Sequence, residues 1–225
     1  MNKFTIGTFN IWKDEGNYPD RIYELSNLIK SNKFDIICLQ EDFNSDDFSS
    51  SKFLNIELDF NYVTTKTRKK YRKNKLSSSN LTVLSKYNVE LLEEQFFYKE
   101  KEEERAYQIL KIDFHDKELL LINTHLCHLS TRRRLLQIKH ILKDIEKYKY
   151  EHIFLCGDLN ALPNYEEIQI IRNSGFLDKN REFTHKEKVI LDYIFHKSNS
   201  NLNVKSKVIY ENFSDHHCLL NSFSI

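Results

Sequence analysis

Acidic, amide and histidine side chains stand at or beside the ends of apolar, strand-like segments that are far apart in this sequence of 225 residues. The residues concerned are Asn10, Glu41, His125, Asp158, Asn160, Asp192, Asp215 and His216. Carboxylate and amide oxygens, without a set of thiolates, favour Mg²⁺ or Mn²⁺ over structural zinc. Histidines beside such a cation suit attack of water on a phosphate ester, because both offset the negative charge that builds on the phosphoryl oxygens.

One of these carboxylates, Asp192, lies inside the apolar run 189–195. Burying a carboxylate costs free energy unless it is paired or bound to a metal. Pairing with a neighbouring basic group in the core would explain Asp192 taken alone. Because polar side chains recur at the ends of several strand-like segments, we expect one shared polar pocket at one edge of a sheet.

The segments that must position these residues are strands mixed with a few helices. The expected strands are 3–9, 35–40, 60–64, 80–85, 106–113, 118–124, 152–157, 190–195, about 204–209, and 217–223. The expected helices are about 19–32 and 131–147, with shorter ones near 46–56 and 165–173. Strands and helices do not alternate strictly, which predicts sheets packed on each other with helices outside.

Composition indicates one globular domain, 1–225, that can bury a sizeable core. The chain has 34 Lys+Arg against 33 Asp+Glu, so the net charge is only +1. This balance excludes a protein that binds polyanions over its whole surface, and any nucleic-acid binding must come from local basic patches. The four cysteines form no CxxC pair, and no segment resembles a signal peptide or a membrane span. We expect an intracellular, cytoplasmic monomer with reduced thiols and no membrane insertion.

Seven short motifs occur in an order that resembles the endonuclease/exonuclease/phosphatase superfamily. They are TFNIW (8–12), LQED (39–42), SNLTVLS (79–85), INTHL (122–126), GDLN (157–160), LDYIF (191–195) and SDHH (214–217). Each motif is weak alone, but together they span essentially the whole chain. The resemblance implies a four-layer αββα sandwich of the α/β class, in which two mixed β-sheets pack face to face.

The resemblance also implies a metal site. Glu41 would be the principal ligand of Mg²⁺, with Mn²⁺ as a substitute, and Asn10 and Asp215 would assist. Many DNA-processing members carry an acidic residue at the place of Trp12, and they have Gly where this chain has Ser79. The first departure leaves a second metal-ligating carboxylate unsupported.

For the catalytic residues, the resemblance implies in-line attack of water at phosphorus without a covalent intermediate. Asp158 would orient or deprotonate the water, and Asn160 would hold that water or a phosphate oxygen. His216 would donate to the scissile phosphate, with its ring held by Asp192. His125 would donate to a non-bridging oxygen.

Several residues are candidates for substrate binding: Asn80, Arg134, Lys70, Arg72 and Trp12. The basic loop 65–79 could contact phosphates of a polynucleotide, or it could be a solvated surface loop. The arginine at the start of the second long helix could hold a phosphate near the histidine. Trp12 could stack on a base or pack on the rim of the sandwich.

For several other residues, the sequence favours an ordinary structural role. Cys127 and the histidines on either side of it lack the spacing of zinc ligands. His185 and His217 carry no signal of their own, and we expect them to be structural.

Three functions remain open from sequence. The first is a Mg²⁺-dependent phosphodiester hydrolase that acts on nucleic acid or nucleic-acid ends. The second is a phosphatase or phospholipase C-type enzyme that acts on a small or lipid phosphate ester. The third is a binding or scaffold protein that kept the fold and lost catalysis.

Overall fold

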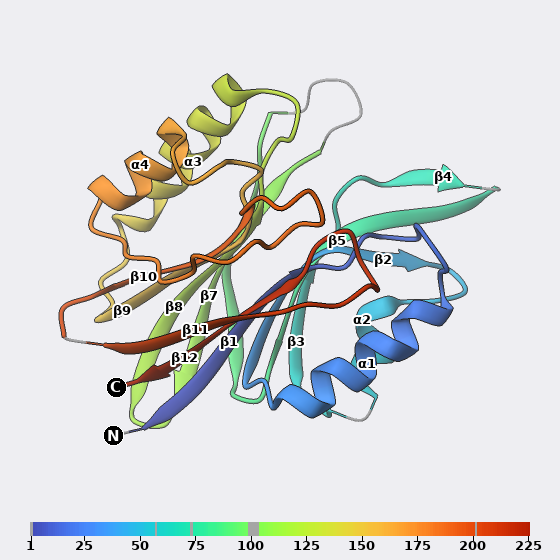
Figure 1. The fold of residues 1–225 in the computed structure, drawn as a ribbon, viewed down its shortest axis with the longest axis horizontal. Helices are drawn as coiled ribbons and strands as arrows, with labels where there is room; N and C mark the ends of the chain where they lie inside the picture. The colour runs from blue at the N-terminus through green and yellow to red at the C-terminus, as the bar shows by residue number, and fades with distance from the viewer. Residues whose placement is uncertain (1, 57, 73, 99–103, 201) are drawn as a thin grey trace.

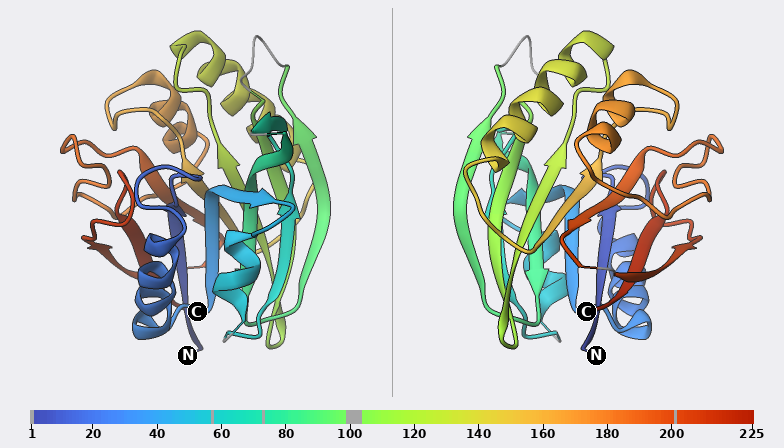
Figure 2. Two further views of the ribbon diagram at one scale, coloured as in Figure 1. Left: turned by 90° about the vertical axis from the view of Figure 1, so that its right-hand side faces the viewer. Right: turned by 90° about the vertical axis from the view of Figure 1, so that its left-hand side faces the viewer.

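The computed structural model describes residues 2–56, 58–72, 74–98, 104–200 and 202–225, with the side chain of Arg72 left aside. Two β-sheets lie face to face, with helices outside both (Figures 1 and 2). The larger sheet has the order β11-β12-β1-β2-β5-β3, and β4 also pairs with β5. Its strands are β1 (Lys3–Asn10), β2 (Ile36–Ser45), β3 (Asn61–Thr65), β4 (Lys70–Arg72), β5 (Lys75–Ser85), β11 (Asn203–Ile209) and β12 (Cys218–Ser224).

The smaller sheet has the order β10-β9-β8-β7-β6. Its strands are β6 (Val89–Phe96), β7 (Ala106–Phe114), β8 (Lys117–His125), β9 (His152–Asp158) and β10 (Asp192–Ser198). Each sheet contains one parallel pair, β1 with β2 and β8 with β9, among antiparallel neighbours. Both sheets are therefore mixed, which confirms the predicted fold class.

In the described part of the chain, four helices form the outer layers. The helices α1 (Asp20–Asn32) and α2 (Ser50–Asn55) lie against the larger sheet, whereas α3 (Thr131–Ile145) and α4 (Glu166–Asn173) cover the smaller one (Figure 1). The helix α3 begins where the Ser130 hydroxyl accepts a hydrogen bond from the Arg133 backbone N–H. Its buried residues, among them Ile138, Ile141 and Ile145, recur every three or four positions and pack on the sheet. Among the described residues, no helix is long and apolar enough to cross a membrane.

The core between the sheets follows from the alternation of side chains along each strand. In β8, Leu119 and Leu121 face the other sheet, and Leu120 and Ile122 face the helices. A strand that is covered on both faces reads as one continuous apolar run, as 119–122 does in the sequence. All four cysteines are buried thiols.

A buried polar layer joins the two sheets directly below their polar end. Gln40 of β2 donates to Asn123 of β8 at 2.8 Å, and Asn123 donates to Gln108 of β7 at 3.1 Å. All three side chains are completely buried, so each hydrogen bond is protected from water. This network fixes the spacing of the sheets one residue before Glu41 in β2 and two residues before His125 in β8.

Two local predictions were wrong. The segment 65–79, expected to be a loop, contains β4 and the start of β5, which form a hairpin that projects from the molecule (Figure 1). The strand β6 was not predicted. Among the described residues, Lys70 of β4 and Glu90 and Glu94 of β6 are exposed charged side chains, which shield sheet edges from other chains but hide the strand pattern in the sequence. The helix expected near 46–56 is limited to α2.

Candidate active site

Asp158, at the end of β9, is the centre of the site and is almost completely buried. Asn10, from β1 in the other sheet, donates from Nδ2 to Oδ2 of Asp158 at 3.0 Å. The same oxygen lies 3.3 Å from Nε2 of His125 and 3.6 Å from Nε2 of His216. The structure thus brings three of the predicted site residues together around the carboxylate of a fourth, Asp158.

Strand pairing explains why these residues meet. In the parallel pairing of β8 with β9, His125 lies beside Asp158, and in the antiparallel pairing of β10 with β9, Asp192 lies opposite Asp158. Gly157 has a φ of 143°, and a Cβ at this position would lie 1.9 Å from the carbonyl oxygen of Thr124. Glycine is therefore required here for β9 to approach β8 and set the histidine beside the carboxylate.

Asp192 and His216 form the second part of the site. Oδ2 of Asp192 lies 2.8 Å from Nδ1 of His216, and the Thr184 hydroxyl accepts the backbone N–H of Asp192 at 3.0 Å. Burial raises the pKa of Asp192. Burial by itself would lower the pKa of His216, but Asp192 and Asp158 raise it well above the usual range. His216 is therefore an imidazolium at neutral pH, with its Nε2 directed toward Asp158.

Asp158 itself stays ionised. Burial by itself would raise its pKa, but the charge of His216 and the hydrogen bonds from His125 and Asn10 hold the pKa of Asp158 well below its usual range. Its other oxygen, Oδ1, accepts the backbone N–H of Asn160 at 2.9 Å. The Asn160 side chain is half-buried and donates from Nδ2 to the carbonyl of Leu126 at 3.1 Å, which keeps it next to the carboxylate.

Glu41 lies in a bulge within β2, where the pairing with β5 shifts between Leu39 and Asp42. The residue adopts a φ of 53°, the left-handed region that a non-glycine residue rarely occupies. Asp42 holds the bulge from inside: its carboxylate accepts from the Thr82 hydroxyl at 2.6 Å and from the Ser51 backbone N–H of α2 at 2.9 Å. The bulge therefore gives two adjacent acidic residues different roles.

Positive groups surround the Glu41 carboxylate. Nζ of Lys13 lies 3.4 Å from it, and the Arg68 guanidinium lies 3.1 Å from it. Burial by itself would raise the pKa of Glu41, but the neighbouring His125, Lys13 and arginines lower it. An ionised, nearly buried carboxylate that already attracts two cations fits a divalent cation, and Asn10, on the strand paired with β2, carries an amide oxygen of the type that such a cation accepts.

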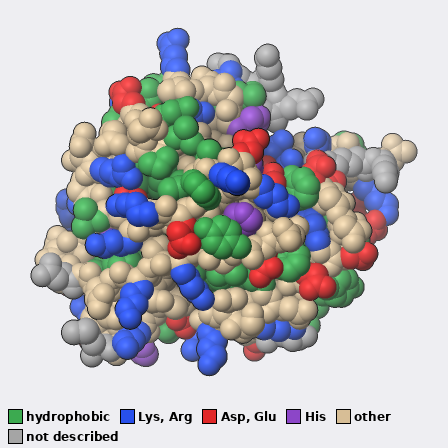
Figure 3. Space-filling view, in the orientation of Figure 1, with side chains coloured by type: hydrophobic (Ala, Val, Ile, Leu, Met, Phe, Trp, Pro, Cys, Tyr) green, Lys and Arg blue, Asp and Glu red, His purple; other side chains and the backbone are tan. Residues whose placement is uncertain are grey.

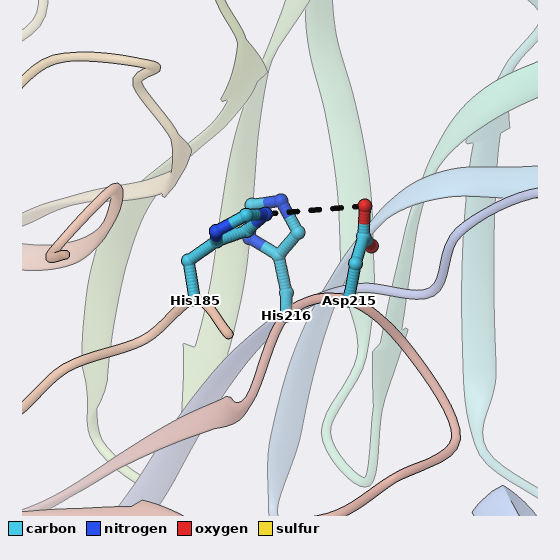
Figure 4. Close-up of side chains that lie close together, drawn as sticks. All are labelled: His185, Asp215 and His216. Carbon is cyan, nitrogen blue, oxygen red and sulfur yellow. Dashed lines mark ion pairs between the residues drawn. The ribbon is translucent and has the colours of Figure 1, made fainter. Parts of the chain in front are cut away.

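The third predicted metal ligand, Asp215, is less buried. Its Oδ1 accepts from the Ser214 hydroxyl at 3.2 Å, and its Oδ2 lies 3.9 Å from Nε2 of His185 (Figure 4). Asp215 therefore belongs to the loop that carries His216, and its described partners are a hydroxyl and a histidine.

The predicted substrate residues divide into three groups: two residues next to the site, two on β4 and one on α3. The residues next to the site are Asn80 and Trp12. Asn80 of β5 is buried and lines a small hollow together with Glu41, Arg68 and His125. Trp12 is half-buried and adjoins the site, because its backbone N–H donates to Oδ1 of Asn10 at 3.1 Å.

Lys70 is exposed on β4, and the side chain of Arg72 lies outside the described part of the structure. In the space-filling view, a histidine near the middle of the face adjoins a hydrophobic side chain and basic side chains, with acidic side chains farther out (Figure 3).

Arg134 does not have the role expected of it. Its Nε donates to Oε1 of Glu167 at 2.8 Å, and its other nitrogens donate to the Cys127 carbonyl at 3.2 Å and the Thr131 hydroxyl at 2.9 Å. The side chain is buried, and each of its three nitrogens donates to a protein oxygen. Arg134 therefore joins α3 to α4 in place of binding a phosphate.

A different arginine, Arg105, contacts the site histidine. It is buried, and its NH1 lies 2.7 Å from Nδ1 and 2.9 Å from Nε2 of His125, while its NH2 lies 3.1 Å from Nδ1 of His128. Burial and the charge of Arg105 lower the pKa of His125, so this histidine is neutral. Arg105 was not among the residues predicted for the site. It ends a run of charged residues in the sequence, and its position immediately before a predicted strand is the signal that could have identified it.

The sandwich and the residues at its polar end define a phosphoester hydrolase. The chain belongs to the Endonuclease/Exonuclease/phosphatase family, whose model matches residues 7–216. The motifs in the sequence had predicted this family, and the prediction is confirmed. No protein of curated function matches the sequence significantly.

Solved structures share the fold at low identity. An endonuclease/exonuclease/phosphatase family protein from Leptotrichia buccalis C-1013-b gives a TM-score of 0.77 at 21% identity, covering 99% of this chain and 100% of that chain. Humanized D. rerio TDP2 with 14 mutations gives 0.74 at 19% identity, covering 99% of each chain. The Bacteroides thetaiotaomicron VPI-5482 mannosyl-6-phosphatase Bt3783 gives 0.72 at 14% identity, covering 99% of this chain and 100% of that chain.

Proposed function

We propose that this protein is a Mg²⁺-dependent phosphodiester hydrolase that acts on nucleic acid or nucleic-acid ends. The observation that carries this proposal is the ionised Asp158 between Asn10, His125 and His216, with Asp192 behind the last of these. A binding or scaffold protein without catalytic activity would gain nothing from the buried carboxylates of Asp158 and Asp192 and the imidazolium of His216. Burying each of these charges costs free energy unless the charge is compensated or serves a function.

Glu41, with Asn10 and Asp215, would hold the metal ion. Bound there, Mg²⁺ supplies positive charge to a phosphoryl oxygen, as a Lewis acid. Lys13 and Arg68 now compensate the charge of Glu41, and a bound cation would leave them available to substrate phosphates.

The chain's own groups would carry the rest of the reaction. Asp158 accepts a hydrogen bond from the attacking water and orients it; its low pKa makes it a weak base, so orientation is its main role. His216 donates from Nε2 to a phosphate oxygen, and Asp192 keeps the proton on the ring. Neutral His125 donates to a second oxygen, with the charge of Arg105 next to it. The attacking water forms a new P–O bond and gives up a proton to solvent by way of Asp158, while the bond to the leaving group breaks and the leaving oxygen takes up a proton from solvent.

The basic hairpin favours a polynucleotide over a small ester. Arg68 lies at the start of this segment and contacts Glu41, whereas Lys69 and Lys70 are exposed farther along. A line of positive side chains that begins at the catalytic carboxylate can follow a phosphate backbone away from the scissile bond.

The test is a panel of labelled substrates incubated with Mg²⁺: nicked, abasic and intact duplex, single-stranded DNA and RNA, a 5′-tyrosyl oligonucleotide, sphingomyelin and an inositol polyphosphate. Glu41→Ala should abolish the activity. Glu118→Ala is the matched control, because this exposed carboxylate lies about 23 Å away from His125 along β8. Cleavage of the lipid or the inositol ester alone would contradict the proposal that the substrate is nucleic acid. A wild type that cleaves none of the substrates would contradict the proposal that the protein is a hydrolase.

A further inference from the structure

A second group of potential ligands lies next to the catalytic carboxylates. The nitrogen and oxygen atoms of His185, Asp215 and His216 lie within 4.8 Å of one another, with Nε2 of His185 3.9 Å from Oδ2 of Asp215 (Figure 4). The two imidazole rings meet edge to face, with centroids 4.7 Å apart at 77°. His185 belongs to none of the sequence motifs and has no role in the proposed hydrolysis.

Backbone hydrogen bonds hold this group in place. The segment 184–189 turns back on itself, and His185 forms β-bridges with both Val189 and His216. The Lys186 N–H donates to the carbonyl of Asp215 at 2.9 Å, and the His217 N–H donates to that of Thr184 at 2.7 Å. Because both segments are tied by their main chains, the three side chains are brought together before any ligand binds.

The donor set suits zinc. Two imidazoles and one carboxylate are ligands that Zn²⁺ accepts in a tetrahedral site with one open position. Nδ1 of His216 is bonded to Asp192, which leaves Nε2 as the ligand atom and supplies the carboxylate that commonly supports a zinc-bound histidine. The carboxylates of Asp192 and Asp158 that favour a proton on His216 also favour a divalent cation in its place.

Binding requires the three ligand atoms to move closer together. Zn–N and Zn–O bonds of about 2.0–2.1 Å place tetrahedral ligands roughly 3.4 Å apart, so the His185–Asp215 pair must close by about 0.5 Å. The two pairs that include His216 lie within 4.8 Å and must close by at most about 1.4 Å. Coordination through Nε2 puts the ring proton of His185 on Nδ1, and the 3.2 Å contact from the Glu187 N–H to that atom is lost. That contact is exposed, so water can replace it.

We propose that His185, Asp215 and His216 form an inhibitory Zn²⁺ site. Zinc on Nε2 of His216 occupies the atom that the proposed hydrolysis directs to the phosphate, and it withdraws Asp215 from the Mg²⁺ ligands. The inhibitory part rests on the proposed function, whereas the metal site itself does not. His185 is the selective ligand: zinc needs it, and hydrolysis does not.

The test separates binding from activity. Co²⁺ replaces Zn²⁺ and gives visible absorption bands when its ligands are tetrahedral, so Co²⁺ titration reports the site without any substrate. The wild type should bind one Co²⁺ with these bands, and Zn²⁺ should remove them. His185→Ala should weaken this binding at least tenfold, and it should raise the Zn²⁺ concentration for half-inhibition by the same factor while leaving the Mg²⁺-dependent rate unchanged.

Two further variants control the result. His140→Ala removes an exposed histidine of α3 and should change neither quantity. His185→Gln keeps the volume and polarity of the side chain if the alanine variant does not fold.

Four outcomes are distinguishable. Unchanged Co²⁺ bands in folded His185 variants would overturn the site, and so would a wild type without bands. A zinc-free His185 variant that is folded but slow with Mg²⁺ would overturn the selective role, because His185 would then position the catalytic groups. Tetrahedral bands in a wild type that hydrolyses nothing would support the metal site and refute the proposed function instead.

Discussion

The imidazolium of His216 provides the sharpest test of the proposed mechanism. Asp192→Asn keeps the shape of the side chain but removes the charge 2.8 Å from Nδ1 of His216. A hydrogen bond to a charged group contributes about 1.5–3 kcal/mol, which corresponds to a pKa change of about 1–2 units. The pKa of His216, raised to about 10 in the wild type, should therefore fall toward about 8–9.

The sign of the effect on activity follows from this change. His216 acts in its protonated form, so the rate falls as pH rises through its pKa. In the variant this decline should begin about 1–2 pH units earlier, which makes the loss small near pH 6 and about two- to tenfold near pH 9. A second effect, poorer orientation of the ring by an amide, lowers the rate at every pH and can be subtracted at the acidic end.

The assay is a profile of kcat/KM against pH at saturating Mg²⁺, for the wild type and for Asp192→Asn. Glu41→Gln serves as the comparison, because loss of a metal ligand should lower the whole profile without moving its alkaline limb. Thermal unfolding of each variant verifies the fold. If the alkaline limb of Asp192→Asn coincides with that of the wild type, the role assigned to the His216 proton is wrong.

Three other changes test separate parts of the structure. Glu41→Gln should reduce the Mg²⁺-dependent rate by at least about a thousandfold, as measured by Mg²⁺ titration of turnover; a modest loss would show that the metal is held elsewhere. Arg134→Met should lower the free energy of unfolding by about 3–5 kcal/mol in urea titrations, because it leaves Glu167 buried and unpaired, while kcat of the folded enzyme changes little. Lys70→Ala should raise KM for an oligonucleotide and reduce the slope of log K against log salt by about 0.9, whereas equal slopes would place this residue away from the phosphates.

Part of the fold and part of the site can be predicted from local sequence patterns. Continuous apolar runs such as 119–122 identify strands that are covered on both faces, and the three- and four-residue spacing of apolar side chains identifies α3. Polar residues at the ends of these runs mark the edge where the site forms. Asp158 and Asp192 could be predicted because a carboxylate inside or at the end of an apolar strand costs free energy unless it has a partner.

Local sequence patterns gave wrong predictions where the role of a residue depends on a contact with a residue far away in the sequence. Arg134 and Arg105 are both arginines near predicted site elements, and nothing in their neighbours in sequence separates the one that pairs with Glu167 from the one that contacts His125. The charged strands β4 and β6 lie at or near the edges of the sheets. Each is held by backbone pairing with its neighbouring strand, and neither shows an apolar face in the sequence.

The family, the class of fold and the expected chemistry of the site can be predicted from the sequence, because each of these depends on which residue types stand at strand ends. Tertiary structure alone decided the partners. Asn10 meets Asp158 across 148 positions of chain, and His185 meets His216 through a bridge between two loops. Such contacts depend on sheet register and on how two sheets pack, and these are properties of the whole molecule that no local pattern encodes.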